Sequence, residues 1–249
     1  WEERPKYGAL QLVDHPDGPC PRFGSCYFVL HPEVSSRCTF TPLGSQGDRV
    51  GEQSGTLAVF EPVMAAMVRH LESVPRPLGC GGLSLAELVS RMKAALPFAP
   101  AGGSPGQMGR SLDSFIEAQV HGPVELERDV ATLVADASFR GTEVGRLIER
   151  LASAYMIPLR WHPGFRLPAE EFPEEFRGFE TRRVAERVAV DGVVDAASLG
   201  AGENDFRVAP GAWRDFGSES EVLTKFRRVW HVLVLSGEPS HGWVDSSSH

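Results

Sequence analysis

Phe115-Ile-Glu-Ala-Gln-Val-His121 is the stretch that decides the fold class of this chain. Its alternating polarity predicts a β-strand, because successive side chains of a strand point to opposite faces. The apolar face would carry Ile116, Ala118 and Val120. The other face would carry Phe115, Glu117, Gln119 and His121. An acid, an amide and an imidazole would then project in one row, although an ordinary half-buried surface strand has the same pattern.

Length and composition are typical of a globular protein with a substantial core. The chain has 249 residues, of which 42% are hydrophobic and 23% charged, and this predicts one large or two small domains. Its 25 Lys and Arg stand against 33 Asp and Glu, so the formal net charge is −8. Such an acidic chain is not suited to coating nucleic acid non-specifically, although a local basic cleft is compatible with it.

The spacing of cysteine and histidine argues against a metal centre. The four cysteines contain no Cys-x-x-Cys pair, so we expect buried free thiols, as in a reducing cytoplasm, rather than a zinc site. His15 and Asp17 have metal-binding chemistry, but no third ligand accompanies them, which favours a turn. No signal peptide and no apolar run of about 18 residues is visible, which predicts no membrane span. A cytoplasmic location is expected, and secretion as an effector stays open.

Two other kinds of catalytic site find little support. Cys26 or Cys38 with a distant histidine would make a nucleophilic pair, but Cys26 lies in a stretch that we expect to be buried. Ser25 follows Gly24 without the Gly-x-Ser-x-Gly pattern of a nucleophile elbow. The chain also lacks Gly-x-Gly-x-x-Gly after a strand and any phosphate-binding loop, so dinucleotide-binding and P-loop folds have no basis.

The remaining pattern mixes strands and helices without regular alternation. The expected strands are 9–13, Cys26–Leu30 as a central strand, 38–41, 115–121 and, as the last one, 157–161. The expected helices are 60–71, 84–96, 126–134, a helix capped by Thr142 and reaching Tyr155, 180–190, 193–200 and 218–235. Irregular alternation predicts an α+β fold with a small sheet and surrounding helices. We expect an α+β core at 1–162 and a mainly helical region at 163–249.

Several motifs resemble a bacterial family of unknown function that is common in actinobacteria. The motifs are Glu3-Arg-Pro-Lys-Tyr-Gly-Ala-Leu10, Pro21-Arg-Phe-Gly-Ser-Cys-Tyr27, Ser36-Arg-Cys-Thr-Phe-Thr41, Glu117-Ala-Gln-Val-His-Gly-Pro-Val124 and Asp136-Ala-Ser-Phe-Arg-Gly141. The family resemblance to which these motifs belong covers about two thirds of the chain. Members of that family carry an upstream segment with an Arg and a Thr-Gly-x-Ser-Asn-Gly-like element, which we expect before Trp1.

The order of motifs also distantly resembles ADP-ribosyltransferases, especially toxins that modify DNA. Tyr7-Gly8 is followed by Val34, Arg37 and Thr39–Thr41, and then by a strand with one glutamate. The resemblance implies a small split antiparallel or mixed sheet, with NAD as substrate and DNA, RNA, protein or a small molecule as acceptor. It also implies that Glu117 is catalytic and that Gln119 and His121 line the same pocket.

The resemblance implies further residues that bind NAD: Arg4, Tyr7, Gly8, Arg22, Phe23, Ser25 and Tyr27. Positive charge develops on the ribose when the bond to nicotinamide breaks, and a carboxylate can stabilise it. Tyr7 or Tyr27 would stack on nicotinamide. Arg4 or Arg22 would meet the pyrophosphate bidentately, and Gly8 would allow close approach of the ligand.

Purely structural roles are the alternative for each of these residues. Arg4 is then a surface residue, Tyr7 a core or turn tyrosine, and Arg22 and Phe23 shape a loop. At the level of function, an NAD glycohydrolase would use the same pocket with water as acceptor. A non-catalytic interaction module with the same fold is a further alternative. In an immunity or scaffold role, the acidic surface would bind a basic partner.

Overall fold

The chain divides into two compact units. The structure is a computed structural model that describes residues 4–45, 50–94, 107–174 and 180–240. The first unit comprises Trp1–Phe23, Tyr27–Leu133 and Ala152–Leu159. The second comprises Gly24–Cys26, Val134–Leu151 and Arg160–His249.

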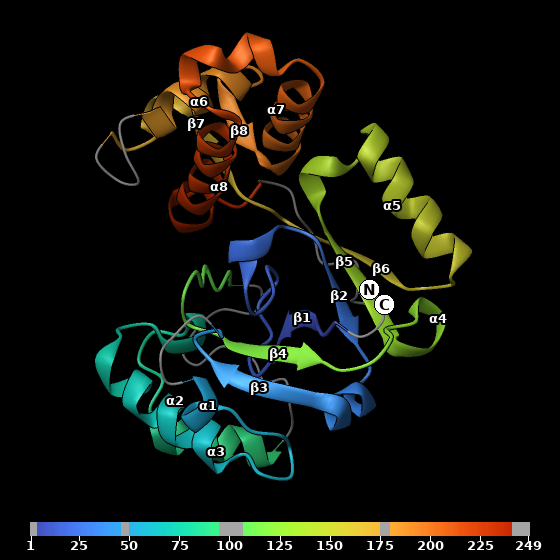
Figure 1. The fold of residues 1–249 in the computed structure, drawn as a ribbon, viewed down its shortest axis with the longest axis vertical. Helices are drawn as coiled ribbons and strands as arrows, with labels where there is room; N and C mark the ends of the chain where they lie inside the picture. The colour runs from blue at the N-terminus through green and yellow to red at the C-terminus, as the bar shows by residue number, and fades with distance from the viewer. Residues whose placement is uncertain (1–3, 46–49, 95–106, 175–179, 241–249) are drawn as a thin grey trace. The chain divides into compact units, whose positions relative to one another are not determined.

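Short strands and helices alternate irregularly along the chain (Figure 1). The strands are β1 (Lys6–Ala9), β2 (Tyr27–Leu30), β3 (Cys38–Pro42), β4 (Ile116–Val120), β5 (Val130–Asp136), β6 (Leu159–His162), β7 (Arg166–Pro168) and β8 (Val193–Asp195). The α-helices are α1 (Val50–Gln53), α2 (Glu61–Ser73), α3 (Leu85–Ala94), α4 (Leu126–Asp129), α5 (Glu143–Ala154), α6 (Glu180–Val188), α7 (Ala196–Val208) and α8 (Glu219–Ser236). Short 3-10 turns occupy Pro21–Phe23, Pro32–Arg37, Pro77–Gly79, Ala137–Phe139, Ala169–Glu171 and Pro210–Phe216.

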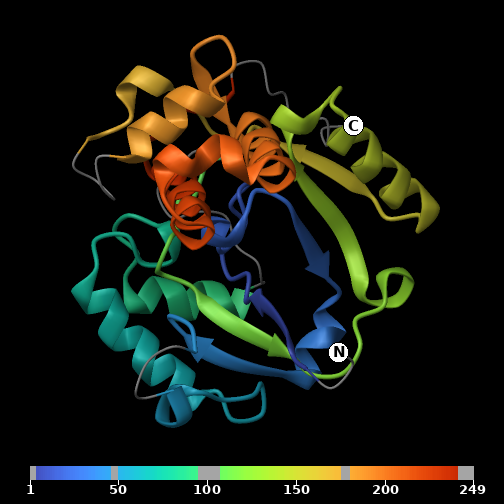
Figure 2. The same ribbon diagram turned by 45° about the horizontal axis from the view of Figure 1, so that its top comes forward.

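The first unit contains an antiparallel sheet with the order β1-β4-β3. Figures 1 and 2 show β4 lying between the other two strands. The prediction of a strand at 115–121 is confirmed by β4. The first strand, however, is Lys6–Ala9 and not 9–13. The N–H of Leu10 still donates to the carbonyl of Ile116 at 2.8 Å, and Leu12 and Val13 beyond it are buried in the core cluster.

Helices α2 and α3 cover one face of this sheet. Their apolar side chains join those of β3 and β4 in one buried cluster, which includes Val63, Met67, Leu88, Phe40 and Ile116. The helical spacing of apolar residues at 60–71 and 84–96 correctly predicted both helices. Residues 95 and 96 lie outside the described part of the chain.

A second three-stranded sheet has the order β2-β5-β6. Two predictions are wrong here. The expected helix 126–134 stops at Asp129, whose side chain accepts the N–H of Glu125 at 2.8 Å, and the β-branched residues that follow form β5. The stretch Cys26–Leu30 is not a central strand, because β2 pairs on one side only and β5 takes the centre.

Helices α6, α7 and α8 surround the antiparallel pair β7-β8 in the second unit. The strand at 157–161 is therefore not the last one. The expected helix 193–200 begins only after β8, because Asp195 caps α7 by accepting the N–H of Ser198 at 2.8 Å. The helix expected at 218–235 is confirmed by α8, with Ser218 and Glu221 as a capping box.

Aromatic side chains form the core beneath α6–α8. Trp213 is buried, with its ring centroid 5.1 Å from that of Phe226 and 6.2 Å from that of Phe206. The guanidinium carbon of Arg187 lies 4.0 Å from the centroid of the Trp213 ring. The α+β class with small sheets and a helical C-terminal part is thus confirmed. Within the described ranges no helix has the length and apolarity that crossing a bilayer requires.

Candidate functional site

Polar side chains line one face of the β1-β4-β3 sheet. Residues directly opposite each other in an antiparallel pair share a face. The register gives one row of Tyr7, Gln119 and Thr39, and a neighbouring row of Ala9, Glu117 and Thr41. Ile116, Ala118 and Val120 contribute to the core cluster on the other face. The two faces that alternation predicts for the central strand are therefore present.

Glu117 is buried on this polar face, with 8% of its surface exposed. Both carboxylate oxygens have protein partners. Nε2 of Gln119 donates to Oε1 at 3.0 Å, and the backbone N–H of Ser45 donates to Oε2 at 3.3 Å. Because an unpaired buried carboxylate is costly, these two bonds determine the orientation in which the acid is held.

The turn after β3 brings the backbone against Glu117. Leu43 and Gly44 both have positive φ, 63° and 89°, and for leucine this conformation costs roughly 1–2 kcal/mol. The N–H of Leu43 donates to the carbonyl of Phe115 at 2.8 Å, which ties the turn to the start of β4. Backbone strain is thus located beside the candidate acid, where functional sites often store it.

An aromatic pair lies next to Glu117 along the strand. The rings of Phe115 and Phe23 meet edge to face with centroids 5.9 Å apart. Phe115 is buried, whereas Phe23 is 75% exposed. A Cβ added at Gly44 would lie 3.5 Å from both the Phe115 ring and Oε2 of Glu117, so the ring and the acid border the same turn.

Arg22 and Asp113 form an ion pair beside this aromatic pair. The guanidinium carbon of Arg22 lies 5.9 Å from the centroid of the Phe23 ring. Burial raises the pKa of the Cys20 thiol to about 12, Arg22 opposes this rise, and the carboxylates of Asp113 and Glu117 add to it. The charges of Arg22 and Glu117 thus shift the pKa of Cys20 in opposite directions.

Tyr7 and His121 lie towards the other end of the polar face. Tyr7 stands opposite Gln119 and is 67% exposed. His121 is exposed, and its Nε2 lies 2.8 Å from Oγ1 of Thr39. The phenol ring and the imidazole are therefore available to a ligand that reaches Gln119.

In the described part of the chain, the contacts seen for the remaining predicted residues are with groups other than Glu117. Arg4 is exposed before β1. Gly8 faces Ala118, and a Cβ there would meet only its carbonyl oxygen at 4.0 Å, so no close approach requires glycine. The hydroxyl of Tyr27 donates to the carbonyl of Pro16 at 3.0 Å. Ser25 belongs to the second unit, where its carbonyl lies 2.6 Å from Nε2 of His162.

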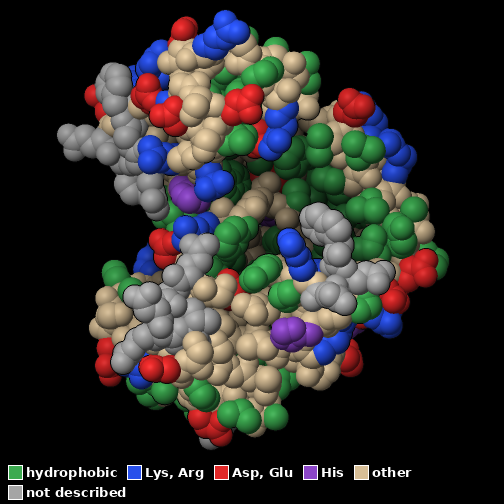
Figure 3. All heavy atoms as spheres, in the orientation of Figure 1, with side chains coloured by type: hydrophobic (Ala, Val, Ile, Leu, Met, Phe, Trp, Pro, Cys, Tyr) green, Lys and Arg blue, Asp and Glu red, His purple; other side chains and the backbone are tan. Residues whose placement is uncertain are grey.

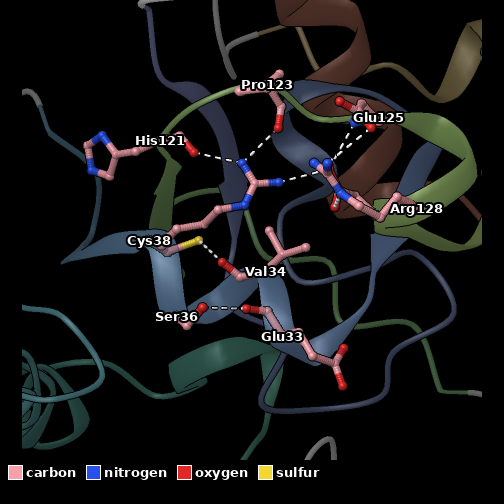
Figure 4. A network of polar contacts seen from close by, with 10 residues as sticks. Glu33, Val34, Ser36, Cys38, His121, Pro123, Glu125 and Arg128 are labelled. Carbon is pink, nitrogen blue, oxygen red and sulfur yellow. Dashed lines mark hydrogen bonds and ion pairs between the residues drawn. The ribbon is translucent and has the colours of Figure 1, made fainter.

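Arg37 organises the loop that follows the candidate strand. Figure 4 shows the polar network of this loop, with His121, Pro123 and Arg128 labelled. Its Nη1 donates to the carbonyls of His121 and Pro123, both at 2.7 Å. Its Nη2 pairs with Oδ2 of Asp129 at 2.8 Å. Sequence patterns placed Arg37 in a motif without a role, because its partners lie more than 80 residues away along the chain.

Asp129 is the buried anion of this network. It also accepts hydrogen bonds from Arg128 and from the N–H of Glu125. Hydrogen bonds from Arg128 and the Glu125 backbone, together with the charge of Arg37, hold the pKa of Asp129 well below its usual range. The network fixes the segment from His121 to Asp129 against the start of β3.

His15 and Asp17 form hydrogen bonds with distant parts of the first unit. The two ring nitrogens of His15 lie 3.1 Å and 3.0 Å from the carbonyl oxygens of Gln107 and Leu78. Asp17 accepts the N–H of Gly109 at 2.7 Å. Burial lowers the pKa of His15, but Cys80, the Gln107 carbonyl and Asp17 raise it overall. Among the described residues no group of three His, Cys, Asp or Glu side chains could hold a metal ion.

A second buried acid, Asp136, lies in the other unit. It is fully buried, and Oδ1 accepts the N–H of Ser138 at 2.9 Å, while Oδ2 has no hydrogen-bond partner in the described part of the chain. Burial raises its pKa, and the charge of His162 opposes the rise. A Cβ at Gly164 would lie 2.2 Å from Oδ1, so this glycine leaves the space that the carboxyl fills.

Comparison with known families gives a match over most of the chain. A family model described as a protein of unknown function (DUF3626) matches residues 1–235. The chain belongs to this family. No curated protein matches the sequence. In this DUF3626 chain, the polar face of β4 bears the buried Glu117, its partner Gln119 and the exposed Tyr7.

Proposed function

We propose that this DUF3626 protein cleaves the nicotinamide–ribose bond of NAD and transfers ADP-ribose to an acceptor, with Glu117 as the catalytic carboxylate. One observation carries the proposal. The buried carboxylate of Glu117 is oriented by Gln119 on a face that also bears exposed aromatic side chains. A buried carboxylate stabilises positive charge far better than one in bulk water.

Glu117 would accept a hydrogen bond from a ribose hydroxyl and stabilise the positive charge that develops on the sugar. To do so it must exchange one of its present partners for the substrate. The Ser45 N–H is the weaker partner, at 3.3 Å against 3.0 Å for Gln119. In the proposed complex Gln119 therefore keeps the carboxylate oriented, while Oε2 turns to the ribose.

Tyr7 and Phe23 are suited to stack on planar groups of the ligand, because each is more than half exposed. Arg22 would meet the pyrophosphate. Its present partner Asp113 is largely exposed, with 68% of its side chain accessible. Exposed ion pairs are worth only about 0–1 kcal/mol, so the guanidinium can change partners at little cost.

NAD hydrolysis is the second candidate, and the low exposure of Glu117 favours it. With 8% of its surface accessible, the acid can be reached by water more easily than by a macromolecular nucleophile. The same residues would act in both reactions. Transfer and hydrolysis therefore differ only in whether ADP-ribose leaves free or attached to an acceptor.

Nicotinamide release from NAD by the full-length protein tests the proposal. Glu117→Gln keeps the shape of the side chain and removes its charge, so release should fall by at least about a hundredfold. Glu33→Gln, at an exposed position, is the matched control and should release nicotinamide at the wild-type rate.

Unchanged release in Glu117→Gln would remove Glu117 from the mechanism. No release by the wild type, together with no NAD binding by calorimetry, would favour a non-catalytic interaction module. Mass analysis of the products separates the two reactions: free ADP-ribose indicates hydrolysis, and an ADP-ribosylated DNA, RNA or protein indicates transfer.

A further inference from the structure

Helix α5 exposes an apolar stripe that nothing in the proposed function uses. At 3.6 residues per turn, its apolar residues fall on one side of the helix. They are Val144, Leu147, Ile148 and Leu151, and Tyr155 continues the line. Val144 is 47% exposed and Leu147 49%, and Figure 3 shows hydrophobic side chains gathering on the surface at α5.

Only one edge of this stripe is covered. Gly145 and Ala152, which lie together on that edge, are buried. A Cβ at Gly145 would lie 2.1 Å from the carbonyl oxygen of Phe139, so the backbone approaches closely there. Val144 and Leu147 lie on the opposite edge and face outward. A helix of this length is marginal in water by itself, which makes an uncovered apolar edge a mark of an interface.

The helix is electrically neutral in an otherwise acidic protein. Glu143 and Glu149 balance Arg146 and Arg150, whereas the whole chain has a formal charge of −8. Two copies of α5 can therefore approach without the repulsion that other acidic surfaces would produce. This neutrality favours a second copy of the same chain over a strongly charged partner.

The charges that flank the exposed edge can form ion pairs with the same residues of a second copy. Glu143 and Arg150 are seven residues apart, two turns along one flank of the stripe. In an antiparallel pair of helices related by a two-fold axis, Glu143 of each copy faces Arg150 of the other. The same register places Val144 against Leu147 of the second copy, so the apolar and charged contacts agree.

We propose that two copies of this protein associate through α5 in an antiparallel, two-fold symmetric pair. Val144 and Leu147 form its centre, and Glu143 and Arg150 form its flanking ion pairs. The contact is small, because a 12-residue helix is about 18 Å long. This contact is smaller than the standard size of tight interfaces. We therefore expect a weak dimer, with a dissociation constant on the order of micromolar.

Sedimentation equilibrium from low to high micromolar protein concentration tests whether two copies associate through α5. The wild type should shift from monomer to dimer across this range. Leu147→Glu should remain monomeric, because it places a carboxylate in the apolar centre. Val208→Glu is the control, since Val208 is 78% exposed at the end of another helix, and it should dimerise like the wild type.

Charge reversal tests the register. Glu143→Arg and Arg150→Glu should each weaken the dimer about tenfold or more, and the double variant should restore it. Melting temperatures of all variants show that they are folded. A wild type that is monomeric throughout, or a Leu147→Glu variant that dimerises normally, would overturn the proposal. Failure of the double variant to recover would overturn the antiparallel register.

Discussion

Gln119 donates a hydrogen bond from Nε2 to Oε1 of Glu117 at 3.0 Å, from two positions further along the same strand. Side chains two apart on a strand share a face, so this contact follows from local geometry. Ser45, which holds the other oxygen, comes from a turn 72 residues earlier. The candidate acid is thus oriented by one local and one distant group.

Replacing Gln119 by Met should impair catalysis without unfolding the protein. Methionine has a similar shape but cannot donate to Glu117. On the proposed function, kcat/KM for nicotinamide release should fall about tenfold, which corresponds to about 1.4 kcal/mol of transition-state stabilisation. Gln11→Met, at a glutamine whose Nε2 donates to Asp14, is the control. Equal rates for the two variants would show that Gln119 does not position the acid.

Gly164→Ala should destabilise the second unit strongly. The new Cβ would lie 2.2 Å from Oδ1 of Asp136, and φ at Gly164 is +71°. We expect a loss of more than about 3 kcal/mol in the free energy of unfolding. Gly141→Ala is a matched control with φ at +75° and no atom within 4 Å of the new Cβ. It should lose only about 1 kcal/mol, and similar losses in both would mean that the clash with Asp136 is absent.

Asp129→Asn should destabilise the Arg37 network. The substitution removes the carboxylate that accepts hydrogen bonds from Arg37 and Arg128, whose own side chains are 29% and 56% exposed and stay solvated. This predicts a loss of about 1–2 kcal/mol in denaturant unfolding at neutral pH. The pKa of Asp129 is lower in the folded state than in the unfolded state. Its stabilising contribution is therefore present above the unfolded pKa and declines as the pH falls below about 4. The difference between wild type and variant should shrink on acidification, and a constant difference would contradict this assignment.

His15 should make the free energy of unfolding decrease as the pH rises above neutral. Its pKa is raised in the folded state, so its contribution is complete below the unfolded value of 6.5 and is lost as the pH rises through the folded pKa. His15→Gln should flatten this dependence between neutral and mildly alkaline pH in urea unfolding. His31→Gln, at an exposed histidine, should leave the slope as it is in the wild type. Identical slopes for all three proteins would show that a positively charged His15 does not stabilise the folded state.

Sequence patterns predicted well those elements that local chemistry determines. Ser218 and Thr142 start their helices through side-chain hydrogen bonds to residues three positions away. The alternation at 116–120 correctly assigned the two faces of β4. Residues 126–134 were misassigned, because their apolar spacing fits a helix and a strand equally well and the pairing of β5 with distant strands decides the matter.

The sequence by itself determined the family, the α+β class and the presence of an acid and an amide on one strand, with an imidazole directly after it. Only the tertiary structure decided how deeply Glu117 is buried, that Ser45 reaches it and that Arg37 holds the loop beyond it. The physical reason is distance along the chain. Propensity and periodicity act over a few residues, whereas burial and these hydrogen bonds join segments more than 70 residues apart.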